Sequence, residues 1–438
     1  KLAYVGALIT ATIEERKVML YTQKVRHSPE ENEPNALHLW VTDNNRTFHF
    51  GPFSVDSAEN KTFANTLLYS DGELYLLQQR GSTTSTAVSL ARLTEELSKI
   101  KSVLSTWKKL DAFFSESSIP TAGLVGFLSD AASDDVTWID EYRCLNASVT
   151  KAAKVENGFK FKGPGSGATW PVNSWLDNNQ YGFVNHGFTL VAMVTIHQAS
   201  KESTSLLGAS LWEGQGTKII GLSYGMNKTW ETVVDGKTTA QDRTWELGRE
   251  YQVALMLQGG NKGSVYVNGK LVGNLETIRT PEEQGVEISH FYIGGDEGDS
   301  GSDVTVKNVF LYNRPLSSTE MSALRDKFTI LERGPEPQVG GASQLIGPAV
   351  SALSGLEETP ADPMGPDTSR SRTEGGEAQG RTATTQDALT GKLPYAGSEG
   401  TAREAGDGGA NGDSSSVYGS GMLLPLLLLL GLWEFAAP

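Results

Sequence analysis

A two-residue alternation of apolar and polar side chains recurs through most of residues 1–333, in short runs separated by Gly, Asn and Asp. Alternating side chains point to opposite faces of an extended chain, so each run predicts a half-buried β-strand. Asp71 and Gly72 stand between two such runs, which is the pattern of a tight hairpin. Before residue 88 the runs cover residues 7–13, 17–25, 37–50 and 65–79. The sequence therefore predicts an all-β fold.

One segment departs from this alternation. Its apolar residues recur at helical spacing, with charged residues between them, which is the pattern of an amphipathic helix. These residues are Leu93, Leu97, Ile100, Leu104, Trp107 and Phe114. We therefore expect one long helix over residues 89–115 that links two β-rich parts of the chain, residues 1–88 and 121–333.

The second β-rich part carries its own turn and cap signals. Asn268 and Gly269 predict a type I′ turn, because both residue types adopt the left-handed backbone that this turn requires. Ser317 and Glu320 form a capping box, which signals the start of a short final helix. Strands are expected within residues 187–197, 205–212, 218–225, 250–258, 263–275, 288–295 and, last, 304–314. Short strands at this spacing predict a jelly roll of two sheets.

Charge and cysteine content exclude several classes of protein. The formal net charge is −15 and Lys and Arg are not clustered, so we expect no nucleic-acid partner. Cys144 is the single cysteine, which excludes an internal disulfide framework and is interpreted as a buried free thiol. The histidines show no metal-ligand spacing, so we expect no metal and no cofactor. They are His27, His38, His49, His186, His197 and His290.

The C-terminal residues carry a membrane-attachment pattern. Residues 334–416 are rich in Gly, Ser, Thr, Pro, Ala and acidic residues, and they predict a disordered stalk. Residues 417–438 are mostly apolar and follow small residues and a short polar spacer, which favours a GPI-attachment signal over a tail anchor. The attachment candidates are Gly412, Asp413 and Ser414. The expected location is the extracellular face of the plasma membrane, reached through the secretory pathway.

N-x-S/T sequons are glycosylated only in a protein that enters the secretory pathway, so the expected location makes these sequons candidate sites. The predicted N-glycosylation sites are Asn45, Asn60, Asn146 and Asn227.

A family resemblance rests on several motifs, which are TATIEERKVML, LHLWVTDNNRTFHFGP, KSVLSTWKKLDAFF, GLVGFLSDAA, YRCLNAS and, most specific of all, VTVKNVFLYNR. On these segments the chain resembles the trans-sialidase superfamily of trypanosomatid surface glycoproteins over essentially its whole length. The resemblance implies a six-bladed sialidase β-propeller, a linker helix, a concanavalin- or laminin-G-like lectin jelly roll, a stalk and a GPI signal. Residues 1–88 resemble only the C-terminal part of that propeller.

The resemblance also implies what an active member would need. Active members use a tyrosine nucleophile activated by a glutamate, an arginine triad that holds the sialate carboxylate, and an aspartate acid/base. By resemblance the tyrosine position falls at Ala64, in a stretch without tyrosine. The glutamate position is Gln79, an amide that is no base near neutral pH, and the third arginine position is Pro34. We therefore expect no catalysis, and we interpret Tyr69 and Tyr75 as strand tyrosines packed in the core.

The motif VTVKNVFLYNR has two interpretations. Uninterrupted alternation predicts a closing strand with Val304, Val306, Phe310 and Tyr312 on one face, while Val309, Leu311 and Lys307 point away from Phe310. The resemblance implies that its aromatic core attaches to host cytokeratin and endothelium, and that related members bind laminin. We keep both interpretations, a structural strand and an adhesive face. The candidate adhesion motif is Val304, Thr305, Val306, Lys307, Asn308, Val309, Phe310, Leu311, Tyr312, Asn313 and Arg314.

The resulting hypothesis is a catalytically inactive trans-sialidase-like surface glycoprotein. It would act in host-cell adhesion and invasion by binding laminin, cytokeratin, or sialylated or galactosyl glycans. Two alternatives stay open: an active exo-α-sialidase or trans-sialidase, and an immune-evasion antigen that binds complement or acts as a decoy.

Overall fold

The computed structural model describes residues 4–26, 34–57, 59–82, 84–129, 133–173, 180–211, 217–278, 287–296, 298–299 and 301–332. The predicted stalk and the predicted GPI signal, with Gly412, Asp413 and Ser414, lie outside these residues, as does His27. Within the described ranges, no helix is both long enough and apolar enough to cross a membrane.

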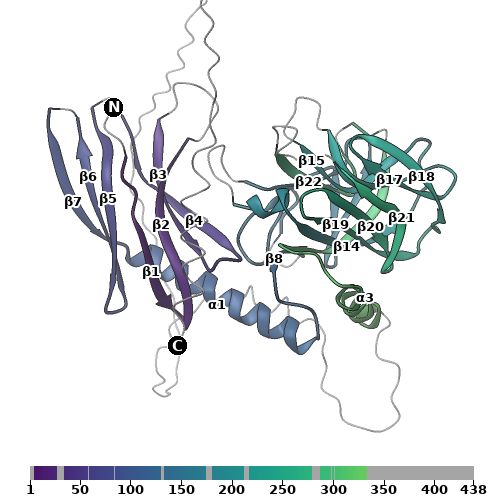
Figure 1. Ribbon diagram of the computed structural model, residues 1–438, viewed down its shortest axis with the longest axis horizontal. Coiled ribbons are helices and arrows are strands. Elements are labelled where there is room, and N and C mark those ends of the chain that lie inside the picture. The colour runs from purple at the N-terminus through teal and green to yellow at the C-terminus, as the bar shows by residue number, and fades with distance from the viewer. Residues whose placement is uncertain are drawn as a thin grey trace, which may run out of the picture. The chain divides into compact units, whose positions relative to one another are not determined.

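The N-terminal part forms two antiparallel sheets (Figure 1). Their apolar interior includes Leu39, Leu67 and Leu76, each exposed by 4% or less. The predicted hairpin is present, with Asp71 and Gly72 at φ angles of 53° and 76°. The four-stranded sheet consists of β1 (Leu8–Ile13), β2 (Arg16–Arg26), β3 (Asn35–Thr42) and β4 (Thr47–Val55). The three-stranded sheet consists of β5 (Lys61–Ser70), β6 (Glu73–Gly81) and β7 (Thr86–Arg92).

The linking helix α1 (Thr94–Glu116) begins later than the predicted residue 89, because the preceding residues form β7 and pair with β6. All side chains of β7 are exposed, and Val88 and Leu90 are each 67% exposed. A strand without a buried face leaves no burial pattern to separate it from the start of a helix. The buried face of α1 is otherwise the predicted one, with Leu110 added: Leu97, Ile100, Leu104, Trp107, Leu110 and Phe114.

The C-terminal part begins after α1 and is again rich in strands. Its elements up to the middle of the sandwich are β8 (Leu124–Leu128), β9 (Thr137–Trp138), β10 (Ala147–Thr150), β11 (Ala152–Val155), β12 (Gly158–Gly163), β13 (Gly167–Pro171), the 3-10 helix η1 (Gly182–Asn185), β14 (Phe188–Ile196) and β15 (Thr204–Leu211). The remaining elements are β16 (Lys218–Tyr224), β17 (Thr229–Val234), β18 (Lys237–Thr244), β19 (Glu250–Gln258), β20 (Lys262–Val267), β21 (Lys270–Thr277), β22 (Ile288–Ile293), β23 (Ser302–Tyr312) and α3 (Ser318–Glu332).

These strands form a sandwich of two eight-stranded sheets, which confirms the predicted fold class. One sheet has the order β18-β17-β16-β15-β22-β13-β10-β9, and the other has the order β11-β12-β23-β14-β19-β20-β21, with β8 also paired to β23. The predicted turn between β20 and β21 is present, with Asn268 and Gly269 at φ angles of 51° and 71°. The predicted capping box also forms, because the Glu320 N–H donates to Ser317 Oγ and the Ser317 N–H donates to the Glu320 carboxylate.

Arg46 joins the two β-rich parts and the helix between them. Its side chain is 4% exposed, and its guanidinium pairs with both carboxylate oxygens of Asp111 on α1 at 2.7 and 3.1 Å. Its Nε donates to the Leu124 carbonyl at the start of β8 at 2.9 Å. The guanidinium also lies 4.0 Å from the ring centroid of Tyr142, a cation–π contact. One side chain from the β3–β4 turn therefore contacts both α1 and the sandwich.

Asp140 holds the loop that presents Tyr142 to Arg46. Its buried carboxylate accepts backbone N–H bonds from Phe127, Tyr142 and Cys144 at 2.9 to 3.1 Å. The two oxygens of a carboxylate offer about four lone-pair sites, so this one side chain can accept several N–H groups at once and order the loop. Cys144 is the buried free thiol that the sequence predicted.

We expect Arg46→Met to lower the free energy of unfolding by about 1.5 to 3 kcal/mol, the usual contribution of hydrogen bonds that involve a charged group. Methionine retains much of the buried stem, but the Leu124 carbonyl loses the Arg46 donor, and Asp111 keeps only its bonds from Arg16 and the Tyr142 hydroxyl. Urea unfolding followed by tryptophan fluorescence measures the change. Lys108→Met, which breaks the exposed ion pair with Glu15, is the control and should leave the unfolding midpoint nearly unchanged. Equal midpoints for both variants would contradict a central role of Arg46.

Candidate functional site

The two positions at which the family resemblance implies a tyrosine nucleophile and its glutamate base lie in the β5–β6 hairpin. Ala64 and Gln79 are directly opposite each other in the register of this antiparallel pair. Directly opposed side chains are close neighbours, so the structure brings the two predicted positions together. Ala64 is half-buried beside Val5, and Gln79 is exposed. Pro34 lies exposed before β3. The pair in the hairpin offers a methyl group and a neutral amide, neither of which is a nucleophile or a base.

The two tyrosines near this pair have different environments. Tyr69 packs against the apolar interior, as predicted. The prediction for Tyr75 is wrong, because this residue lies on the outer face of the sheet, in register with Leu68 and Arg92. Its hydroxyl donates to the Glu73 carboxylate, and this bond raises the pKa of Tyr75 above its ordinary value. The bond stabilises the neutral phenol, which is the opposite of activating it as a nucleophile.

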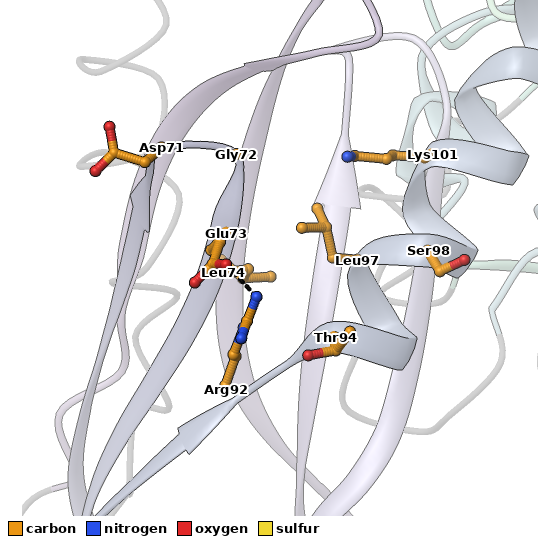
Figure 2. Close-up of a pocket in the computed structure, with 9 residues that line it drawn as sticks. All are labelled: Asp71, Gly72, Glu73, Leu74, Arg92, Thr94, Leu97, Ser98 and Lys101. Atoms are coloured by element: carbon orange, nitrogen blue, oxygen red, sulfur yellow. Dashed lines mark hydrogen bonds and ion pairs between the residues drawn. The ribbon is translucent and has the colours of Figure 1, made fainter.

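A pocket of about 350 Å³ lies at the turn end of the same hairpin, beside the start of α1 (Figure 2). Leu74 and Leu97 contribute apolar lining, and Glu73 and Arg92 form an ion pair within it (Figure 2). Its volume is at the lower end of the range of about 300 to 1,000 Å³ that is usual for small-molecule sites. The lining contains neither residue of the sialidase-like pair, so the pocket belongs to a different part of the hairpin. Among the residues that the structure places, no group of three or more His, Cys, Asp and Glu could hold a metal ion.

The candidate adhesion motif forms β23, which is the last strand in the chain but lies in the middle of its sheet. One edge of β23 pairs with β14. The other edge pairs first with β12 and then with β8. Both edges are therefore occupied along the strand, and an extended partner has no unpaired backbone to meet there.

A bulge at Asn308 reverses the predicted faces of this strand. Asn308 has a φ angle of 48°, a left-handed conformation that asparagine tolerates better than most residues. It lies where the partner changes from β12 to β8. After the bulge, Leu311 opposes Leu190 of β14, on the same face on which Val306 opposes Val194. Leu311 therefore points to the same side as Val306 and away from Phe310, as predicted. Two other predictions are wrong: Val304 and Val306 do not share a face with Phe310 and Tyr312, and Lys307, opposite Met193, points to the same side as Phe310.

Phe310 and Tyr312 occupy the opposite face, on which α1 packs and beside which β8 pairs in the same sheet. The Phe310 ring stacks on Phe127 of β8 at 4.6 Å between centroids and meets Phe114 of α1 edge-on at 5.7 Å. The Tyr312 hydroxyl donates to the Pro120 carbonyl at 3.0 Å. Both side chains are fully buried, as are Val304, Val306, Val309 and Leu311. Thr305 and Asn308 are each 8% exposed.

What remains accessible in the motif is Lys307 and the end of the strand, where Asn313 and Arg314 are half-exposed. Arg314 is tied down, because its guanidinium pairs with Glu320 at 2.5 and 3.2 Å and its Nε donates to the Ala122 carbonyl. We call Ala122, Asn313 and Arg314 the strand-end surface. It is the part of the strand's C-terminal end that a partner reaches without unfolding the sandwich.

All four predicted glycosylation asparagines, Asn45, Asn60, Asn146 and Asn227, are exposed. Asn45 lies in the β3–β4 turn, and its side-chain oxygen accepts a hydrogen bond from Asn313 Nδ2 at 3.3 Å. The structure thus brings a sequon and the strand-end surface together. Sequence reasoning missed this neighbourhood, because the two residues are 268 positions apart.

We expect Phe310→Ala to lower the free energy of unfolding by roughly 3 to 5 kcal/mol, the usual cost of truncating a buried phenylalanine. Its ring has close contacts to Phe114 and Phe127 that no smaller side chain replaces. Lys307→Ala, at a half-exposed position of the same strand, is the matched control and should cost less than about 1 kcal/mol. Chemical unfolding measures both. A stable Phe310→Ala variant would mean that this strand is not part of the core.

The Arg314–Glu320 pair should make stability depend on pH. Hydrogen bonding to Arg314 lowers the pKa of Glu320 from its ordinary value of 4.5 to about 2. A lowered folded-state pKa stabilises the fold above the unfolded value, and this contribution is lost as the pH falls from about 4.5 to about 2. Glu320→Gln removes the titrating group. The difference in Tm between wild type and this variant should therefore be largest above pH 5 and shrink toward pH 2, and a constant difference would contradict the pairing.

Three family models match the chain. The trans-sialidase C-terminal domain matches residues 120–319, and the BNR repeat-like domain matches residues 2–80. The hydrophobic C-terminal segment of Trypanosoma trans-sialidases matches residues 415–437. That segment is the GPI-anchor signal of the family, so the protein is a GPI-anchored cell-surface protein.

Relatives and solved structures agree with these matches. The chain is 47% identical to Sialidase 85-1.1 of Trypanosoma cruzi, over 99% of this chain and 53% of that protein. It is also 47% identical to Sialidase 85-1.3 of Trypanosoma cruzi, over 39% of this chain and 99% of that protein. The structure of Trypanosoma rangeli sialidase is similar with a TM-score of 0.66 and 37% identity, over 73% of this chain and 52% of that one. The chain spans about half the length of the first relative and of this structure. By sequence and by fold, it belongs to the trans-sialidase superfamily of trypanosomes.

Proposed function

We propose that this chain is a catalytically inactive member of the family that acts as a surface adhesin, attaching the parasite to host laminin, cytokeratin or surface glycans. The single observation that carries the proposal is the pair Ala64 and Gln79, which stands where the family resemblance implies a tyrosine and a glutamate. The relatives named sialidase make an active enzyme the competing hypothesis.

The argument against catalysis is chemical. A phenol attacks an anomeric carbon efficiently only when a nearby base takes its proton. Neither requirement is met by a methyl group opposite an amide. Tyr75 is not a substitute, because its hydroxyl is bound to Glu73 and its pKa is raised. The replacement of the pair thus removes the reaction while leaving the hairpin intact.

The argument for adhesion rests on location and access. A GPI-anchored protein presents its folded part outside the cell, where host proteins and glycans are available. In the candidate motif, the buried residues Val304, Val306 and Phe310 to Tyr312 cannot meet a partner in the folded state. The strand-end surface, with Asn313 and Arg314, is therefore the part of the motif to which we assign the contact.

We expect the full chain, released from expressing cells by phospholipase C, to neither hydrolyse sialyllactose nor transfer sialate to lactose. An active sialidase assayed beside it is the positive control. The same preparation is tested for binding to immobilised laminin and to cytokeratin, and we expect binding to at least one of them.

Two outcomes would contradict the proposal. Turnover of sialyllactose by the wild type would show that the chain is an enzyme, and its loss in Tyr75→Phe would assign the nucleophile to Tyr75. Absence of turnover together with absence of binding to either host protein would remove the adhesive half of the proposal.

A further inference from the structure

Asn45 and Asn313 form a fixed contact between the β3–β4 turn and the end of β23. The Asn45 side-chain oxygen accepts a hydrogen bond from Asn313 Nδ2 at 3.3 Å. On its other side the Asn313 amide is in close contact with the Gly123 backbone, where a Cβ would lie 2.6 Å from Asn313 Oδ1. Gly123 has a φ angle of 75°, so glycine suits this position for both reasons. The Asn313 side chain is therefore held between Gly123 and Asn45.

The turn that carries Asn45 is held equally firmly. The Asp43 carboxylate accepts the backbone N–H groups of Asn45 and Arg46 at 3.0 and 2.9 Å, which is an Asx-type turn. The other carboxylate oxygen of Asp43 pairs with Arg16 at 2.5 Å, and Arg46 pairs with Asp111. The side chain of Asn45 thus leaves a turn with fixed direction, although the side chain itself is exposed.

Asn45 is also the first residue of the sequon Asn45-Arg46-Thr47. N-linked glycosylation joins the asparagine amide nitrogen to the anomeric carbon of the first sugar; the nitrogen loses a proton and the lipid pyrophosphate carrier leaves. The nitrogen and the oxygen belong to one planar amide, so the oxygen can still accept from Asn313 when the nitrogen carries a sugar. A glycan on Asn45 would start directly beside the strand-end surface.

We propose that a glycan on Asn45 covers the strand-end surface and controls access to it. The proposal rests on the proposed adhesive function only for its biological consequence, because the covering itself follows from the contact of Asn45 with Asn313. Binding of a host protein at Asn313 and Arg314 would then be strongest in the fraction of molecules that lack this glycan. The occupancy of one sequon would set how adhesive the surface is.

The experiment measures access with a thiol reagent. Ala122 is exposed, and it binds Arg314 through its backbone carbonyl, which a change of side chain retains, so Ala122→Cys reports on the strand-end surface. The native thiol, Cys144, is buried and gives a low background. The full chain with Ala122→Cys is expressed at the surface of eukaryotic cells that perform N-glycosylation. Its rate of labelling by a maleimide-polyethylene glycol is compared with that of the double variant Ala122→Cys, Asn45→Asp. Aspartate removes the glycan but keeps the oxygen that accepts from Asn313. Asn227→Asp removes a sequon on the turn between β16 and β17 and is the matched control.

We expect labelling to be several-fold faster in Asn45→Asp and unchanged in Asn227→Asp. Equal rates for the glycosylated protein and Asn45→Asp would overturn the proposal, as would a peptide mass showing that Asn45 carries no sugar. Binding to laminin and cytokeratin, measured on the same cells without the cysteine, separates the two ideas. Faster labelling with stronger binding in Asn45→Asp supports both masking and adhesion. Faster labelling with unchanged binding supports masking and rejects the strand-end surface as the adhesive contact.

Discussion

Arg46 makes the interaction on which the rest of the described structure depends. Moving a charge out of water costs several kcal/mol unless it is paired, so a guanidinium with 4% exposure requires partners at fixed positions. Asp111, the Leu124 carbonyl and the Tyr142 ring provide them from α1 and from the sandwich. The β3–β4 turn is held in place as a result. It is this fixed turn that positions Asn45 beside the end of β23.

The bulge in β23 explains why a motif with this composition is built into the sandwich. Apolar residues on both faces suit a central strand that is covered on two sides, by the opposite sheet and by α1. Asn308 provides the left-handed residue at which β23 changes its partner from β12 to β8. Arg314 then anchors the end of the strand to the capping box of α3. Packing explains most residues of the motif, and only its accessible C-terminal end is left for a role in adhesion.

The β5–β6 hairpin shows that strand pairing does not depend on the chemical groups at the Ala64 and Gln79 positions. Cross-strand register depends on backbone hydrogen bonds and on the alternation of buried side chains, not on the reactive groups of one pair. Ala64 and Gln79 therefore maintain the pairing that the family fold requires, without a nucleophile or a base. A sialidase-like fold does not by itself establish activity, because function depends on the residues of the site.

Local patterns in the sequence determined the element types, the two tight turns, the capping box and the buried face of α1, because each depends on residues only a few positions apart. The strand β7 escaped detection, since its exposed side chains leave no burial pattern. The sequence also did not reveal that Val304 and Val306 lie on the face opposite Phe310 and Tyr312, because a single extra residue at a bulge reverses every side chain that follows. Only the tertiary structure brought Arg46 to Asp111 and Asn45 to Asn313, across 65 and 268 residues. Such pairs are selected by the packing of whole elements, and no periodicity along the chain records which of them will meet.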